Sequence, residues 1–347
     1  IAVGKAAVSM ARAAQSVLGD LPEVLVVTNP ENASDLPGAQ VFAAAHPIPD
    51  QIGLKAGQTV VAALQRASAA QRPVLCLISG GGSALLPAPI VGISLQDKID
   101  LNALLLASGA NIEVMNLIRQ QLSLLKGGGM LSYASPSPVT SLILSDVIGD
   151  DLRVVASGLT VSPIGTRLQA CSELKALGLW GQTNAAVKTA LERPEEIIDL
   201  PVTKNILIGS NVLSLVAMGK EIPEATIHKM PLVGDVSQAA ARVAAAGPGI
   251  HLFGGETTVR LTGTGRGGRN QELALRVALL AEYQNWQGRW LYLQAGTDGR
   301  DGPTDAAGGV VCEASVSAMS SVGIDPNQLL ANNDAYSTLQ AAKAESL

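Results

Sequence analysis

Val74-Leu75-Cys76-Leu77-Ile78 runs directly into Ser79-Gly80-Gly81-Gly82-Ser83, and this succession decides the fold. A short apolar run that ends in a glycine-rich turn is typical of a buried parallel strand that leads into a helix. The carboxyl ends of such strands are where open α/β sheets bind ligands. Glycines let successive backbone N–H groups converge on an anion, and Ser79 and Ser83 add hydroxyl donors. The turn is therefore predicted to bind an anion, with a flexible structural turn as the alternative.

Similar short apolar runs recur on both sides of this turn and alternate with longer amphipathic stretches. That alternation predicts βα units stacked into a largely parallel sheet, and hence the α/β class. The expected strands are Ile1–Val3, Val24–Thr28, Val41–Ala45, Val74–Ile78, Val139–Leu144, Asn205–Ile208, His251–Phe253, Thr257–Leu261 and Trp290–Gln294.

Two amphipathic stretches after the turn are predicted to be helices. The first runs from Ser94 to Leu106 and opens with Ser94 and Asp97 at capping-box spacing. The second runs from Asn111 to Leu125. Its polar residues fall within one arc of a helical wheel. They are predicted to form a stripe of Asn116, Arg119, Ser123 and Lys126.

The composition indicates a globular chain with two domains. With 347 residues, the chain exceeds the size at which a single core usually stops growing. Hydrophobic residues make up 47% and aromatic residues only 3%, so the core must be aliphatic. A Pro- and charge-rich stretch from Glu192 to Lys204 is the expected seam. We therefore expect one domain over 1–204 and a second over 205–347.

Charge and cysteine usage exclude several classes of protein. The net charge is −5 and no basic block is present, so no nucleic-acid partner is expected. The three cysteines lack CxxC or His-paired spacing, which predicts reduced thiols and a cytoplasmic location. The longest apolar stretches are far shorter than a membrane span, so no membrane partner is expected. Because Ile1 already lies in an expected strand, further residues are expected before it.

A second glycine-rich loop, Gly263 to Glu272, contains a formal GxGxxG match between an expected strand and an expected helix. A lone match of this kind is a weak signal for a dinucleotide fold, and no strand that ends in an acidic residue follows about 20 residues later. Arg266 and Arg269 instead favour a clamp for phosphate or carboxylate groups. An exposed basic turn is the alternative.

Three carboxylates follow the expected strand Trp290–Gln294, in the loop Gly296 to Asp305. Mg²⁺ takes oxygen ligands and usually shares them with substrate phosphates, so Asp298 and Asp305 are candidate metal ligands. Asp-Gly pairs are also common turn formers, and a purely structural loop is the alternative.

Single charged residues at other strand ends are further candidates. Asp146 and Glu256 each follow a strand, where a carboxylate could orient a hydroxyl or a metal ion or simply cap a helix. Lys5 lies at a strand-to-helix turn, where an ammonium could reach a phosphate or remain solvated. His46 lies in a loop that Pro47 and Pro49 rigidify, without a second His or a Cys to form a zinc site.

Ten such segments occur in an order that closely resembles the glycerate 2-kinase family with a C-terminal MOFRL domain. They are Gly4-Lys5-Ala6, His46 to Asp50, Ser79 to Ser83, Lys126 to Gly129, Leu144 to Val147, Ala156-Ser157-Gly158, Gly254 to Val259, Gly265 to Glu272, Gly296 to Gly302 and Asn332-Asn333-Asp334. The family normally has a segment before the first of these motifs and a strand region after the last, and the printed sequence contains neither.

The resemblance implies both a fold and a site. The fold is a Rossmann-like, mostly parallel domain followed by a second α/β domain, with the active site in the cleft between them. Lys5 and Arg269 match the family's proposed catalytic lysine and arginine, and Asp146 is expected to act with them. The residues expected to bind substrate or nucleotide are Ser79, Gly80, Gly81, Gly82, Ser83, Asn116, Arg119, Lys126, Glu256, Asn270 and Gln271.

The implied activity is transfer of a phosphoryl group from ATP, with Mg²⁺, to the 2-hydroxyl of glycerate. An NAD(P)H-dependent hydroxypyruvate reductase and a non-catalytic sensor of a small anionic metabolite are the alternatives. The glycerate stereoisomer stays open, as does a homodimer.

Overall fold

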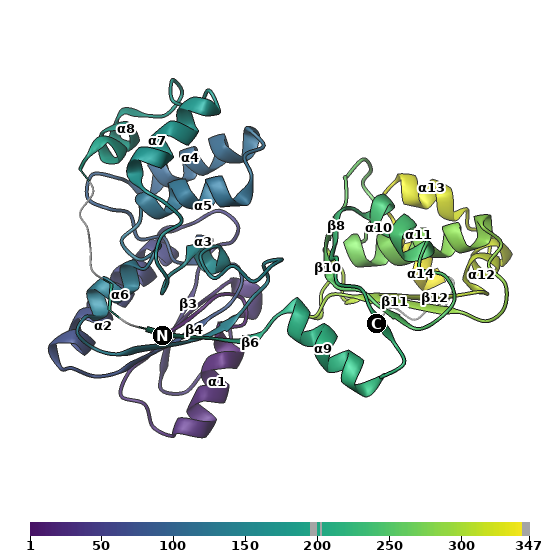
Figure 1. Ribbon diagram of the computed structural model, residues 1–347, viewed down its shortest axis with the longest axis horizontal. Coiled ribbons are helices and arrows are strands. Elements are labelled where there is room, and N and C mark those ends of the chain that lie inside the picture. Colours follow the sequence, from purple (N-terminus) through teal and green to yellow (C-terminus); the bar gives the residue numbers. More distant parts are fainter. Residues whose placement is uncertain (195–199, 202, 342–347) are drawn as a thin grey trace. The chain divides into compact units, whose positions relative to one another are not determined.

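The computed structural model describes residues 1–194, 200, 201 and 203–341, and the chain divides into two compact units, Ile1–Ser210 and Asn211–Leu347 (Figure 1). Part of the expected seam lies outside the described residues. The sequence places the boundary after Lys204, whereas the units divide after Ser210. The reason is that β6 (Thr203–Gly209) pairs with β5 (Val139–Leu144) in the sheet of the first unit.

The first unit is built on a six-stranded parallel sheet, which confirms the predicted Rossmann-like fold. The strand order is β3-β2-β1-β4-β5-β6, the doubly wound order in which the sheet grows first to one side and then to the other. Ligands bind at the switch point of such sheets, here the carboxyl ends of β1 and β4. The remaining strands are β1 (Ala2–Val3), β2 (Val24–Thr28), β3 (Ala39–Ala43) and β4 (Val74–Ile78).

Both faces of this sheet are covered by helices, because consecutive side chains of a strand point to opposite faces. In β2, Val24 and Val26 pack with α1 (Ala7–Leu18). Leu25 and Val27 pack in a separate core with two helices on the other side, α2 (Gln51–Ala69) and α6 (Gly129–Ala134). The central strands are therefore apolar without alternation, as in other sheets buried on both faces.

A helical group with its own apolar core completes the first unit, and Figure 1 shows it beyond the α2 side of the sheet. It contains α4 (Leu95–Ala107), α5 (Ile112–Gln121), α7 (Arg167–Ala176) and α8 (Ala185–Glu192). The capping box predicted at the start of α4 is confirmed, since Ser94 Oγ accepts from Asp97 N at 3.1 Å and Asp97 Oδ2 accepts from Ser94 N at 2.7 Å. Shorter pieces are α3 (Gly82–Leu85) and 3₁₀ turns at Pro30–Asn32 and Val155–Ser157.

The helix predicted from Asn111 to Leu125 is correct only in its first part. Asn111 caps α5, but the helix ends at Gln121, and Ser123 then forms a β-bridge with Pro89. Ser123 and Lys126 therefore lie beyond the helix, and the predicted helical stripe of four polar residues was wrong.

The second unit is a smaller α/β body centred on α11 (Arg269–Tyr283), which has an apolar core on either side. Within its described residues, 211–341, the strand pairs are β7 (Thr226–Ile227) with β9 (His251–Leu252), β8 (Leu232–Asp235) with β10 (Gly255–Thr258), and β11 (Leu291–Ala295) with β12 (Gly308–Cys312). Only the last pair is antiparallel. The other helices are α9 (Asn211–Glu221), α10 (Val236–Ala244), α12 (Ser315–Ser321), α13 (Pro326–Ala331) and α14 (Ala335–Ala341).

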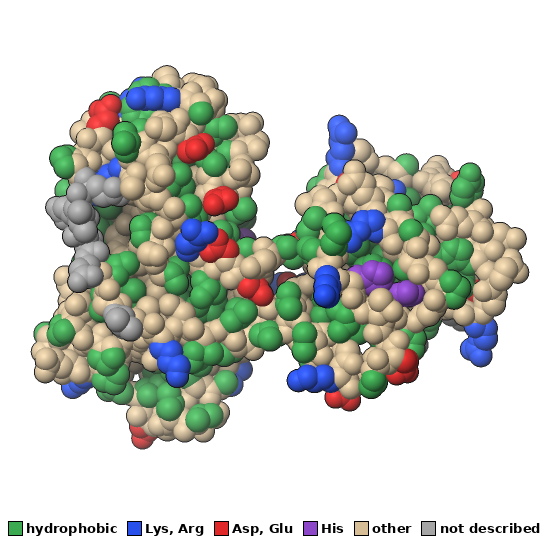
Figure 2. Space-filling model, viewed as in Figure 1, with side chains coloured by type: hydrophobic (Ala, Val, Ile, Leu, Met, Phe, Trp, Pro, Cys, Tyr) green, Lys and Arg blue, Asp and Glu red, His purple; other side chains and the backbone are tan. Residues whose placement is uncertain are grey.

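Charged side chains are dispersed over the face of the molecule that is visible in Figure 2. On the face that Figure 2 shows, Lys and Arg side chains lie scattered among apolar and acidic ones rather than in one basic patch. Among the described residues, no helix has both the length and the apolar character needed to cross a membrane.

Candidate functional site

Lys5 is held at the switch point of the first sheet by contacts between two strand-to-helix turns. The backbone N–H of Lys5 donates to Gly80 O at 2.9 Å, and that of Ala6 donates to Ser79 Oγ at 3.1 Å. Gly4 has φ 120°, and a Cβ there would overlap the Ser79 hydroxyl. The buried hydroxyl of Ser79 thus anchors the start of α1, while the Lys5 side chain remains exposed.

Asp146 and His46 join Lys5 at this edge of the sheet. A Cβ at Gly80 would overlap the Asp146 carboxylate, and one at Gly81 would lie 3.3 Å from Lys5 Cγ and 3.4 Å from His46 Nε2. The glycines therefore make room for a lysine, a histidine and a carboxylate to converge. Burial, and then the charge of Lys5, lower the pKa of His46, so its imidazole is neutral at pH 7.

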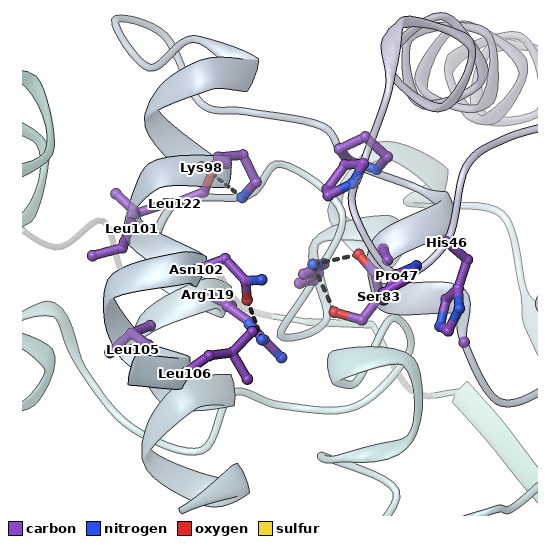
Figure 3. A pocket seen from close by; sticks show the side chains of 15 residues that line it. His46, Pro47, Ser83, Lys98, Leu101, Asn102, Leu105, Leu106, Arg119 and Leu122 are labelled. Carbon is purple, nitrogen blue, oxygen red and sulfur yellow. Dashed lines mark hydrogen bonds between the residues drawn. The ribbon is translucent and has the colours of Figure 1, made fainter. Parts of the chain in front are cut away.

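A cavity of about 230 Å³ opens beside this group, within the first unit. Figure 3 shows Lys98, Asn102 and Arg119 on one side of it, from α4 and α5, with Ser83 and His46 on the other. Leucine side chains of α4 form much of the remaining wall. Gly81 also lines the cavity, so the cavity reaches the loop that contacts Lys5.

Three cationic side chains face the cavity, and each is held by a neutral oxygen. Lys98 Nζ donates to Leu122 O at 3.0 Å. Lys126 Nζ donates to Ser83 O at 2.8 Å and to Ser83 Oγ at 2.9 Å. Arg119 donates to Asn102 Oδ1. None of the described residues that line the cavity is Asp or Glu, and no ion pair within 1–194 or 203–341 involves these cations.

The lowered pKa values of these three side chains show that the cavity destabilises their charged forms. Burial, and then the charge of Arg119, lower the pKa of Lys98 to about 8. Burial lowers the pKa of Lys126 well below its usual value, and Lys98 and Arg119 lower it further. Burial also lowers the pKa of Arg119. Because buried charges are normally paired, a cavity with three repelling cations favours an anion.

Asn116 supports this wall from behind. Its Oδ1 accepts a hydrogen bond from Ser157 Oγ at 2.6 Å, and Ser157 Oγ lies 2.7 Å from Ser83 Oγ. Ala156 and Ser157 have φ values of 49° and 60°, a left-handed conformation that costs free energy outside glycine. Asn116 is 2% exposed and does not line the cavity, so it positions Ser83.

In the second unit, Arg269 and Glu256 form an ion pair, with Arg269 Nη1 2.9 Å from Glu256 Oε1. Arg269 is the first residue of α11, and both side chains are more than 40% exposed. Arg266, expected to share the anion clamp, lies over the ring of Tyr336 at 4.8 Å. The two arginines of this loop thus have different surroundings, and among the described residues an ion pair with a carboxylate is formed by Arg269 and not by Arg266.

The acidic loop is joined to α11 by a residue that the sequence did not single out as a ligand. Asp301 Oδ1 accepts from Asn270 N at 3.0 Å and from Asn270 Nδ2 at 3.1 Å, and Asp301 Oδ2 accepts from Gln271 N at 2.7 Å. Gln271 Nε2 donates to Thr304 Oγ1 at 3.0 Å. Asp301, Asn270 and Gln271 are buried, so the two amides hold the loop against the helix.

The two carboxylates expected to bind metal differ. Asp305 Oδ1 accepts from the Tyr336 hydroxyl at 2.5 Å, which lowers the pKa of Asp305. Asp298 is exposed, and its Oδ1 accepts only a 3.3 Å bond from Arg300 N. The described residues contain no group of three or more His, Cys, Asp or Glu that could hold a metal. Mg²⁺ bound to nucleotide phosphates needs only one or two carboxylates, and Asp298 fits that more modest role.

Sequence reasoning missed Lys98 and Asn102. Both lie on α4 among leucines that face inward, at Leu101 and Leu105. Polar residues at i and i+4 within an apolar face are an available signal, because they interrupt a stripe that would otherwise be buried.

The active-site cleft that the resemblance implies between the two domains stays a prediction.

Comparison with known proteins agrees with the resemblance. Residues 1–192 match the family described as a domain of unknown function, DUF4147, and residues 249–346 match the MOFRL family. A Thermotoga maritima protein named D-glycerate 2-kinase is 37% identical over 99% of this chain and 85% of its own length. A glycerate kinase of Rattus norvegicus is 38% identical over 97% of this chain and 78% of its own length.

A solved structure supports the same assignment. The crystal structure of a glycerate kinase from Thermotoga maritima superposes with a TM-score of 0.87 at 36% identity, over 99% of this chain and 85% of the other. Sequence and fold are therefore shared along nearly the whole chain, which belongs to the glycerate 2-kinase family.

Proposed function

We propose that this chain transfers a phosphoryl group from ATP to the 2-hydroxyl of glycerate. The observation that carries the proposal is the convergence of Lys5, His46 and Asp146 at the switch point of the sheet, beside a cavity lined by cations. The names of the relatives support a glycerate kinase, which implies ATP as the phosphoryl donor.

Phosphoryl transfer asks a protein mainly to position two substrates and to neutralise charge. We assign the Lys5 ammonium to the transferred γ-phosphoryl group, because it lies at the carboxyl ends of β1 and β4, where doubly wound sheets bind ligands. Arg269 matches the family's catalytic arginine, and we assign it to the same group. Its ion pair with Glu256 holds the guanidinium at the start of α11.

The acceptor hydroxyl needs a partner for its proton. Asp146 is placed for this role, since its carboxylate lies against Gly80 and it is exposed at the sheet edge. A carboxylate within hydrogen-bond reach orients the hydroxyl and accepts its proton as the new P–O bond forms. Mg²⁺, which would neutralise phosphate charge when bound with ATP, would be held by Asp298.

The two alternative functions receive no support from the relatives. The glycine loop that suggested a dinucleotide site does not follow the first strand of the parallel sheet, where the fingerprint belongs. It packs instead on the segment Asn332–Asp334, with Gly265 N donating to Asn332 O at 2.9 Å and Thr262 N donating to Asn333 Oδ1 at 2.7 Å.

One experiment tests the proposal against both alternatives. The purified protein is incubated with each glycerate enantiomer, ATP and Mg²⁺, and separately with hydroxypyruvate and NADH. ADP formation with a phosphate on carbon 2, located by phosphorus NMR, is expected. NADH oxidation without ADP formation, or glycerate binding without turnover, would contradict it. Omitting Mg²⁺ tests whether the reaction requires the metal. Sedimentation of the same sample tests whether the protein forms a homodimer. The cytoplasmic location stays a prediction.

A further inference from the structure

The cavity of the first unit has a defined size and a defined charge. At about 230 Å³ it is smaller than the roughly 300–1,000 Å³ of pockets that enclose drug-sized ligands, and so does not suit a whole nucleotide. It would hold about eight water molecules at about 30 Å³ each, which is room for a three-carbon acid. Its lining combines apolar leucines with three cations.

The cations keep donors that the protein does not use. An ammonium has three N–H donors and a guanidinium five. Lys98 donates to one carbonyl, and Arg119 is oriented by Asn102 Oδ1. A carboxylate is planar and takes two parallel N–H donors from a guanidinium, a geometry that suits Arg119. Burial lowers the pKa values of both Lys98 and Arg119, and the charge of Arg119 lowers that of Lys98 further. One carboxylate between the two side chains would stabilise both charges.

We propose that this cavity binds the carboxylate of glycerate, with Lys98 and Arg119 as its direct partners and Asn102 as the residue that orients Arg119. The inference rests on the proposed function and adds to it the substrate end that this unit recognises. Gly81 lines the cavity, and a Cβ there would lie 3.3 Å from Lys5 Cγ, so a short acid anchored in the cavity has its hydroxyl end toward Lys5 and Asp146.

Steady-state kinetics of Lys98→Met provide the first test. Methionine keeps most of the side-chain volume but removes the charge, so the protein should fold, and thermal unfolding checks this. The KM for glycerate should rise about 10–100-fold, the loss expected for a hydrogen bond to a charged group, while the KM for ATP stays within a factor of about two. Lys55→Met, the same change at an exposed position of α2, is the control and should alter neither value.

Calorimetry provides a test that does not depend on turnover. Glycerate and its neutral methyl ester are titrated into the wild type and into Lys98→Met. The wild type should bind glycerate about 10–100-fold more tightly than the ester, and the variant should lose most of that preference. Asn102→Asp places a competing carboxylate beside Arg119, so this variant should also bind glycerate more weakly than the wild type does.

Each possible result bears on the inference. If Lys98→Met raises the KM for ATP and leaves that for glycerate unchanged, the cavity binds nucleotide phosphate and the inference is overturned. An unchanged preference for glycerate over its ester also overturns it. If the wild type binds glycerate through Lys98 but forms no ADP, the inference stands and the proposed function fails.

Discussion

In the second unit, the buried carboxylate of Asp301 receives three N–H donors, whereas in the first unit the buried ammonium of Lys98 donates to a single carbonyl. Burial raises the pKa of Asp301, and the hydrogen bonds from Asn270 and Gln271 oppose that rise. Burial lowers the pKa of Lys98, and a neighbouring cation lowers it further. The charge of Asp301 is thus stabilised by hydrogen bonds within the fold, whereas the ammonium of Lys98 keeps N–H donors that a ligand could use.

This difference separates charges that stabilise the structure from charges that serve binding. A buried group whose partners all lie in the chain should affect stability when it is removed. A buried group that repels its neighbours destabilises the free protein and favours a ligand of opposite sign. The exposed pair of Arg269 and Glu256 belongs to neither class, because surface ion pairs contribute little to stability. Its removal should therefore affect catalysis alone.

The largest expected effect is that of Arg269→Ala. Loss of a charge-neutralising arginine in phosphoryl transfer lowers kcat by roughly 10³–10⁵. The free energy of unfolding should change little, because the ion pair is exposed. Turnover is measured by coupled ADP release, with Arg289→Ala, at a site 97% exposed, as the control. Near-native turnover would remove Arg269 from the mechanism.

Removal of the Asp301 carboxylate, which accepts three hydrogen bonds, should lower the stability of the protein. Asp301→Ala leaves buried N–H groups at Asn270 and Gln271 without an acceptor, which should lower the free energy of unfolding by about 2–4 kcal/mol. Urea unfolding monitored by the fluorescence of Trp286 and Trp290, which lie in the second unit, reports this. Asp298→Ala, at an exposed position, should change it by less than about 0.5 kcal/mol. Equal effects of the two would contradict the comparison.

A methyl group added at Gly80 tests whether the position of the Asp146 carboxylate determines the turnover rate. In Gly80→Ala the new Cβ overlaps the Asp146 carboxylate, which must move. A displacement of about 1 Å in a reacting group can lower kcat roughly 10²-fold. Gly181→Ala, where a Cβ has open space, is the matched control. If both variants keep wild-type turnover, Asp146 does not orient the acceptor hydroxyl.

The smallest expected effect is a pH dependence that sharpens the contrast between the units. Among the described residues, the titratable side chains that line the cavity are those of Lys98, Arg119, Lys126 and His46. As the pH rises through about 8, Lys98 loses its proton, so the KM for glycerate should rise about fivefold between pH 8 and pH 9. In Lys98→Met this component should be absent from the KM profile. A KM for glycerate that does not change with pH in the wild type would exclude Lys98 as a partner.

The stability of the free protein should have the opposite dependence on pH. Because the pKa of Lys98 is lower in the folded chain than in the unfolded one, the penalty for burying its charge applies below about pH 8. It disappears as the pH rises towards the unfolded value, so this group's contribution makes the protein more stable there. Unfolding curves of the wild type and Lys98→Met between pH 7 and pH 10 measure the difference.

The sequence by itself determined the parallel sheet and the loops at its edge. Val74–Ile78 and Val139–Leu144 were predicted with the bounds that the structure has, because both are short, mostly apolar runs, a pattern typical of strands in a parallel sheet. The glycine turn after β4 and the capping box of α4 are local signals too, since they depend on residues within one turn of chain. The two-residue β7 was not predicted, whereas β1 and β9, which are equally short, were expected as Ile1–Val3 and His251–Phe253.

Only the tertiary structure decided which charged residues share a cavity. Arg119 and Lys126 were chosen for a helical stripe that does not exist, yet both face the cavity, because the chain turns after Gln121 and brings Lys126 to Ser83. Asp301, which the sequence did not single out as a ligand, is a buried acceptor for α11. Sequence spacing fixes which residues share one helix or turn, whereas burial and partners depend on packing between segments far apart in the chain.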